Sequence, residues 1–155
     1  EFSSGNQDIG AIKMEVSRNE EPQDDFLIKV RKLASDNNII LIFDECSSGF
    51  RRSNGGLHKY YKVNPDIAVF GKALGNGYGI TAVVGRKSIM DYAQTTFISS
   101  TFWTERVGPT AALKTLEIMQ RTKSWETISK KGKFFKLSFL NGIIEAKKNL
   151  NGTFQ

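Results

Sequence analysis

Four short apolar segments alternate with segments of helical periodicity along this chain. The apolar segments span residues 9–16, 39–43, 66–70 and 80–85, and each is a predicted strand. Residues 39–43 form an unbroken run of β-branched, aliphatic and aromatic side chains, which is typical of a central strand buried on both faces. Strands that alternate with helices predict an α/β domain with a mostly parallel sheet and one further, antiparallel strand.

The spacing of apolar residues predicts the helices. Phe26, Val30 and Leu33 share one face of a helix that opens at residues 22–25 and ends at residues 36–38. A short helix is expected over residues 88–93, while residues 96–101 are polar and β-prone. A further helix is predicted from about Pro109, with apolar or small residues at Ala111, Ala112, Thr115, Leu116 and Met119. Apolar residues also line one face of a C-terminal helix, at Ile128, Phe135, Phe139 and Ile143.

The net charge of +6 is unevenly placed. Residues 1–120 hold 14 basic and 14 acidic side chains, whereas residues 121–155 hold eight basic and two acidic ones. The whole excess therefore lies on the C-terminal helix, where it is best explained as a solvated lysine face. Because no basic motif interleaved with aromatic residues accompanies it, we expect no nucleic-acid partner.

Few side chains are available for metal or disulfide chemistry. Cys46 and His58 are the single cysteine and the single histidine, so no internal disulfide and no zinc cluster can form, and no metal site is expected. His58 is expected to have a structural role. The sequence contains no apolar run of roughly 20 residues, and no secretory signal pattern opens it, so we expect a cytoplasmic protein without a membrane partner.

Polar residues follow two of the predicted strands, at the sheet edge where α/β domains bind ligands. Asp44 and Glu45 follow one strand, and Gly71 and Lys72 follow the next. A P-loop ATPase would need G-x-x-x-x-G-K-[ST] in addition, and Lys72 has neither the first glycine nor the Ser/Thr. A receiver-type signalling domain also uses a strand-end Asp and Lys, and this alternative remains open.

Lys72 lies between a buried strand and a loop with four glycines at positions 71, 75, 77 and 79. A lysine at a mostly buried strand end loses solvation, which favours the neutral amine. Schiff-base chemistry needs a neutral amine, and the glycines would let a bulky ligand approach. Lys72 is therefore the candidate nucleophile.

Two motifs in register resemble class III aminotransferases, which are pyridoxal-phosphate enzymes of fold type I. Residues 44–51, DECSSGFR, resemble D-E-V-x-[TS]-G-F-[GR]. Residues 65–78, PDIAVFGKALGNGY, resemble P-D-[IL]-x-x-x-[GS]-K-[AG]-[LI]-[GA]-[GN]-G-[YL]. Weaker matches at residues 9–15, 81–85 and 99–113 extend the resemblance over roughly residues 9–120, and glutamate-1-semialdehyde aminomutase-like members are the most similar. The sequence departs from the family at Val16, where a proline is usual.

The resemblance implies a role for six residues. Lys72 would be the catalytic residue that forms the Schiff base with pyridoxal 5′-phosphate. Asp44 would pair with the ring nitrogen of the cofactor, Cys46 would pack against the ring, and Ser47 would lie near the 3′ oxygen. Ser100 and Thr101 match the segment that reaches the cofactor phosphate of a neighbouring subunit, which implies a homodimer.

The resemblance also implies an incomplete enzyme. Residues 1–120 would be the second half of the cofactor-binding large domain, and residues 121–155 would begin a truncated small domain. The reaction would transfer an amino group from a donor to a carbonyl acceptor, as a transaminase or an aminomutase. The sequence does not identify the substrate, and a non-catalytic α/β remnant or binding module remains the alternative.

Overall fold

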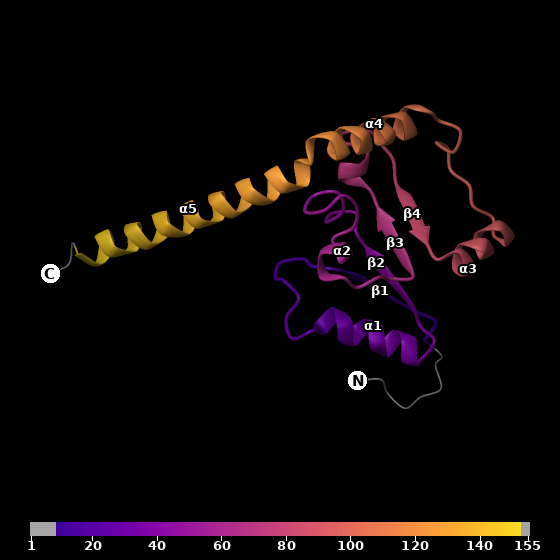
Figure 1. The fold of residues 1–155 in the computed structure, drawn as a ribbon, viewed down its shortest axis with the longest axis horizontal. Helices are drawn as coiled ribbons and strands as arrows, with labels where there is room; N and C mark the ends of the chain where they lie inside the picture. Colours follow the sequence, from indigo (N-terminus) through magenta and orange to yellow (C-terminus); the bar gives the residue numbers. More distant parts are fainter. Residues whose placement is uncertain (1–8, 153–155) are drawn as a thin grey trace.

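A four-stranded mixed sheet forms the centre of the chain (Figure 1). The structure is a computed structural model and describes residues 9–152. The strands are β1 (Ala11–Glu15), β2 (Ile40–Asp44), β3 (Ile67–Phe70) and β4 (Ala82–Gly85), in the spatial order β1-β2-β3-β4. β1, β2 and β3 are parallel, and β4 pairs antiparallel with β3. The predicted α/β fold, with a mostly parallel sheet and one antiparallel strand, is confirmed.

Helices connect and flank the strands, as Figure 1 shows. They are α1 (Phe26–Asp36), α2 (His58–Tyr61), α3 (Lys87–Met90), α4 (Val107–Thr122) and α5 (Ser124–Gly152), with the 3₁₀ turns η1 (Lys72–Leu74) and η2 (Asp91–Thr95). The predicted helix over residues 88–93 is divided between α3 and η2. Residues 96–101 form no strand and are exposed.

One face of the sheet carries the main core. Leu41 and Phe43 are fully buried and pack with Leu27 and Ala34 of α1. Their neighbours on β2, at positions 40, 42 and 44, are only half-buried. The expectation that β2 is buried on both faces is therefore wrong for the described residues, because no described element covers the second face as α1 covers the first.

A second cluster packs β3 against the segments that follow it. Ala68 and Phe70 of β3 contact Leu74 of η1 and Ala112 of α4. This packing fixes the position of Lys72, since η1 begins directly after the buried end of β3. At the carboxyl end of the sheet, β2 thus packs in the main core and β3 packs in the second cluster.

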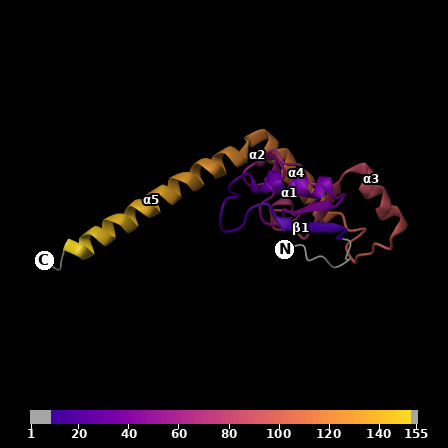
Figure 2. The same cartoon turned by 90° about the horizontal axis from the view of Figure 1, so that it is seen from below.

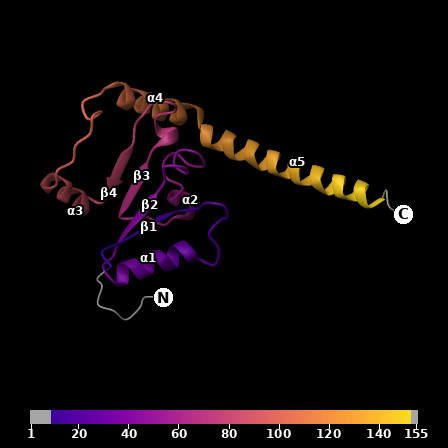
Figure 3. The ribbon, with the colours of Figure 1, turned by 180° about the vertical axis from the view of Figure 1, so that it is seen from behind.

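The last helix leaves the body of the molecule. α5 projects away from the sheet in views from opposite sides and from below (Figures 1, 2 and 3). Lys123, with a φ of 47°, breaks the chain direction between α4 and α5. The predicted helix is confirmed, and its apolar residues Ile128, Phe135, Phe139 and Ile143 are exposed. Over the described residues, none of the helices combines the length and the apolar character that crossing a membrane requires.

Candidate functional site

The carboxyl ends of β2 and β3 lie side by side and bring four of the predicted site residues together. Asp44 is paired with Val69 in the sheet register, and the Glu45 amide donates to the Val69 carbonyl at 2.8 Å. Asp44 is the last residue of β2, Cys46 and Ser47 lie just after it, and Lys72 follows the end of β3. The Lys72 Nζ donates a hydrogen bond to the Ser47 hydroxyl. The structure thus brings these four residues together, and their roles in binding a cofactor stay a prediction.

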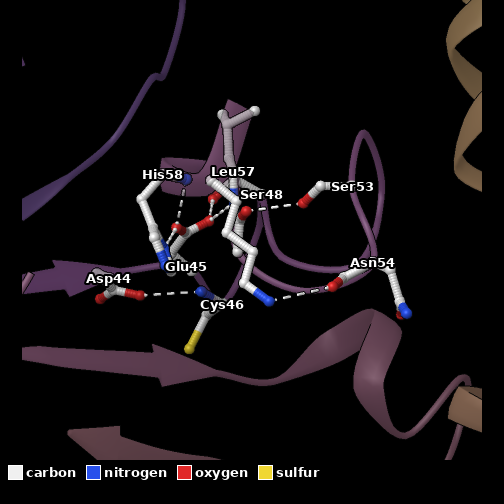
Figure 4. A network of polar contacts seen from close by, with 10 residues as sticks. Asp44, Glu45, Cys46, Ser48, Ser53, Asn54, Leu57 and His58 are labelled. Atoms are coloured by element: carbon white, nitrogen blue, oxygen red, sulfur yellow. Dashed lines mark hydrogen bonds and ion pairs between the residues drawn. The ribbon is translucent and has the colours of Figure 1, made fainter. Parts of the chain in front are cut away.

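Asp44 is held by two contacts. Its Oδ2 lies 3.0 Å from the Lys13 Nζ of β1, and its Oδ1 accepts a hydrogen bond of 3.2 Å from the Cys46 amide (Figure 4 shows the second). The Lys13 hydrogen bond and then the Cys46 amide hold the pKa of Asp44 below its usual value. Asp44 is therefore an ionised acceptor at neutral pH.

Cys46 stands next to both the carboxylate and the glycine that precedes Lys72. A Cβ placed on Gly71 would lie 3.5 Å from the Cys46 Sγ, so the thiol packs directly beside this backbone. Burial and then Asp44 raise the pKa of the Cys46 thiol. The thiol is therefore protonated at neutral pH and behaves as a small, polarisable, neutral surface.

Lys72 is more exposed than the sequence predicts. Its side chain is exposed, because the end of β3 opens at the uncovered face of the sheet, so the described residues do not desolvate the amine. Its backbone has a φ of 41°, in the left-handed region that a non-glycine residue rarely adopts. The adjoining turn is closed by hydrogen bonds from the Leu74 amide to Gly71 and from the Gly75 amide to Lys72.

This backbone conformation predicts an unusual order of stabilities. A left-handed conformation costs a residue with a Cβ about 1–2 kcal/mol, and glycine escapes this cost. After subtracting the greater chain entropy of glycine, Lys72→Gly should be more stable than Lys72→Ala by up to about 1 kcal/mol. Urea unfolding of the two variants measures the difference. Lys29, inside α1, is the matched control, because there alanine should be the more stable residue.

Glu45, next to Asp44 on the chain, is a buried carboxylate that holds the loop after β2, a role that its place at the predicted sheet edge does not indicate. Glu45 is fully buried, and its carboxylate accepts hydrogen bonds from the Leu57 amide (2.6 Å), the His58 amide (2.9 Å) and the Ser48 hydroxyl (2.8 Å). His58 Nδ1 lies 2.6 Å from Oε1 (Figure 4). The only sequence sign was a charged residue directly after a buried strand. His58 has the structural position that was expected.

The ionisation of Glu45 fixes the histidine tautomer. Burial by itself would raise the pKa of Glu45, but the hydrogen bonds from His58, Leu57 and Ser48 outweigh it and lower the pKa below its usual value. A carboxylate only accepts hydrogen bonds, so the Nδ1 of His58 carries the proton that lies between them. Gly56 completes the arrangement, since a Cβ there would lie 2.6 Å from the Glu45 Oε1.

Ser100 and Thr101 stand apart from this cluster. They lie in the exposed segment between η2 and α4, and the Ser100 hydroxyl accepts only a local hydrogen bond, from the Phe102 amide. Within the described residues, neither one contacts Lys72, Asp44 or Cys46. Their expected role, at the cofactor phosphate of a neighbouring subunit, stays a prediction.

Comparison with known proteins identifies the family. The model of the class-III aminotransferase family matches residues 7–150. The 3-aminobutyryl-CoA aminotransferase of Cloacimonas acidaminovorans is 44% identical over 115 residues, which are 74% of this chain and 28% of that protein. The glutamate-1-semialdehyde 2,1-aminomutase of Nitrosopumilus maritimus is 38% identical over 106 residues, which are 66% of this chain and 25% of that protein. The chain therefore spans about 28% or less of the length of these two relatives.

Solved structures show the same fold. An S-selective transaminase from an Arthrobacter species, with alanine bound, has a TM-score of 0.74 and 26% identity, over 85% of this chain and 31% of that one. The PLP internal aldimine form of the Sphingopyxis FumI protein has a TM-score of 0.66 and 28% identity, over 72% of this chain and 28% of that one. The resemblance in the sequence motifs is confirmed, in place of the receiver-type alternative, and this chain belongs to the class-III aminotransferase family.

Proposed function

We propose that this chain is the cofactor-binding portion of a longer enzyme that transfers an amino group with pyridoxal 5′-phosphate. The observation that carries the proposal is the meeting of a primary amine, a hydroxyl and an ionised carboxylate, at Lys72, Ser47 and Asp44, on one edge of the sheet. The short share of the relatives that the chain spans supports the view that further segments complete the site. The substrates would be an amino-group donor and a carbonyl acceptor.

The donor set fits the proposed cofactor. Pyridoxal phosphate has an aldehyde, which needs an amine, and a ring nitrogen, which needs an acidic partner that stays ionised. Lys72 provides the amine at the end of β3, and Asp44 provides an ionised carboxylate at the end of the neighbouring β2. The residues beside these two groups are small: Cys46, Ser47 and Gly71. When bound, the cofactor supplies a ring that accepts electrons from the substrate carbon.

Each of these side chains would have a separate role. Lys72 would hold the cofactor by its aldehyde carbon through Nζ, with release of one water, and its Nζ would later accept the proton from the substrate carbon and return it. Ser47, which accepts the Lys72 hydrogen bond, would orient that Nζ near the 3′ oxygen. Asp44 would accept a hydrogen bond from the protonated ring nitrogen, and the protonated thiol of Cys46 would pack against the ring without adding a charge.

The wider organisation is part of the same proposal. Residues 1–120 would belong to the large domain, and residues 121–155 would begin the small domain. Ser100 and Thr101 would bind the cofactor phosphate of a neighbouring subunit, so the enzyme would be a homodimer. Their exposure in the segment between η2 and α4 supports this assignment, because an exposed loop can reach a second chain. We propose a cytoplasmic location, where the single thiol would stay reduced.

Borohydride trapping tests the proposal. The complete protein that carries these residues would be incubated with pyridoxal phosphate, reduced, digested and analysed by mass spectrometry. We expect the reduced adduct on Lys72, and we expect both Lys72→Ala and Lys72→Arg to lose the adduct and the transamination activity. Lys114→Ala is the matched control, because Lys114 is an exposed lysine of α4 that pairs with Glu117.

Three results would contradict the assignment. An adduct mainly on other lysines would remove Lys72 from the chemistry. Full transamination activity in Lys72→Ala would do the same. No transamination by the complete wild-type protein with any of a broad panel of amino donors and acceptors would favour the non-catalytic binding module instead.

A further inference from the structure

Lys13 has a contact that the family motifs do not account for. It lies on β1, where its neighbours Ile12 and Met14 pack into the main core and Lys13 points to the opposite face. In the register of β1 and β2, Lys13 is opposite Ile42, and Glu15 is opposite Asp44. Lys13 therefore reaches diagonally to the next position on the same face, and its Nζ lies 3.0 Å from the Asp44 Oδ2.

The contact has a clear preference for Asp44. Glu15 is on the same face of the same strand, and its carboxylate is close enough to attract the Lys13 ammonium. The ion pair nevertheless forms with Asp44. The Lys13 side chain is 62% exposed, so the pair is not forced by burial. The Cys46 amide binds the other oxygen of Asp44, and as a result both carboxylate oxygens already have partners.

Resting on the proposed function, we propose that Lys13 is a positioning residue that shares the Asp44 carboxylate with the cofactor ring nitrogen and weakens the hold of Asp44 on that nitrogen. Lys13 brings a second positive charge to the carboxylate that the protonated ring would also use. Two cations on one carboxylate repel each other, so each is bound less tightly than it would be alone.

The other charges around Asp44 do not cancel this effect. Lys13 and Glu15 of β1 face Asp44. The neutral thiol of Cys46 faces it from the segment after β2, and Lys72 follows β3. Glu15 is opposite Asp44 in the register and is itself a carboxylate, so it cannot take the place of Lys13, which is in direct contact with Asp44. The Lys13 contact is also the first cause that lowers the pKa of Asp44, which makes the carboxylate a weaker base and a weaker acceptor.

The test compares cofactor affinity in three variants of the complete protein. Lys13→Met removes the charge and keeps the apolar stem, and Lys13→Arg keeps the charge. Lys32→Met is the matched control, because Lys32 also pairs with an aspartate, Asp36, but on the outer surface of α1. Each protein is titrated with pyridoxal phosphate and with an analogue in which a carbon atom replaces the ring nitrogen. Borohydride trapping on Lys72 is measured in parallel.

We expect Lys13→Met to bind pyridoxal phosphate about fivefold more tightly, as the loss of one like charge at about 4 Å in a water-like medium predicts. Lys13→Arg and Lys32→Met should match the wild type, and the carbon analogue should bind all four proteins equally. Equal affinity of Lys13→Met and wild type for pyridoxal phosphate would overturn the inference, as would the same gain with the carbon analogue. If Lys72 is trapped in none of the proteins, the proposed function fails, and this inference fails with it. If trapping persists without an affinity change, only the inference fails.

Discussion

Glu45→Gln is expected to lower the free energy of unfolding of this chain by about 3–5 kcal/mol, the range for breaking a buried, hydrogen-bonded charge pair. The carboxylate accepts four hydrogen bonds, two at each oxygen: the Leu57 amide and the Ser48 hydroxyl at Oε2, and the His58 amide and Nδ1 at Oε1. A glutamine has the same shape but only one accepting atom. Its NH₂ group would face two donors at a position with no exposure to solvent.

Urea unfolding followed by far-UV circular dichroism measures this loss. Glu117→Gln is the control, because Glu117 is an exposed carboxylate of α4 paired with Lys114, and its change should stay below about 1 kcal/mol. Hydrogen exchange gives a local readout, since the amides of Leu57 and His58 should exchange faster only in Glu45→Gln. A loss no greater than that of the control would show that Glu45 does not hold this loop.

The same carboxylate predicts the direction of the pH dependence. The pKa of Glu45 is lower in the folded chain than in the unfolded chain, despite burial, because of its hydrogen bonds. Its contribution to stability is therefore complete above the pKa of an unfolded glutamate, about 4.3. It is lost as the pH falls through the lower, folded pKa. Wild-type stability should thus decline on the acid side, and Glu45→Gln should show a shallower decline there.

The strands and their order along the chain were predictable because local patterns determine them. Residues 39–43 are too apolar for any exposed position, and Pro65 and the glycines after residue 70 mark the limits of β3. The sheet edge with the candidate site residues was predictable for the same reason, since Asp44 ends one such strand and Lys72 lies two positions after the next. A parallel sheet then places the ends together without further information.

The surroundings of these residues were not predictable in the same way. Lys72 is exposed and β2 is half-buried on one face, because burial depends on what covers the sheet rather than on the strand itself. The contacts from Glu45 to His58 and from Lys13 to Asp44 join residues 13 and 31 positions apart in the sequence. No local pattern marks such pairs, since they arise only when the sheet and the loop after β2 are assembled.

Asp66 also forms long-range contacts of this kind, and its replacement is expected to have the second large effect on stability. Its side chain is 6% exposed and lies just before β3. Oδ2 accepts hydrogen bonds from the Leu41 amide and from Arg31 of α1, both at 2.8 Å, and Oδ1 accepts one of 2.9 Å from Arg86. Burial would raise the pKa of Asp66, but these partners lower it. One carboxylate thus joins α1 and β2 to the segment that follows β4.

Asp66→Asn should therefore cost about 2–4 kcal/mol, because its amide leaves one buried donor without an acceptor. The two arginines should differ: Arg31 is mostly buried in the pair, with 22% of its side chain exposed, whereas Arg86 is 66% exposed. In double-mutant cycles with Asp66→Asn, Arg31→Met should show a clear coupling energy and Arg86→Met one below about 1 kcal/mol. Asp36→Asn, an exposed carboxylate paired with Lys32, is the control. Equal coupling of both arginines would contradict the view that burial, rather than the ion pair alone, gives Asp66 its effect.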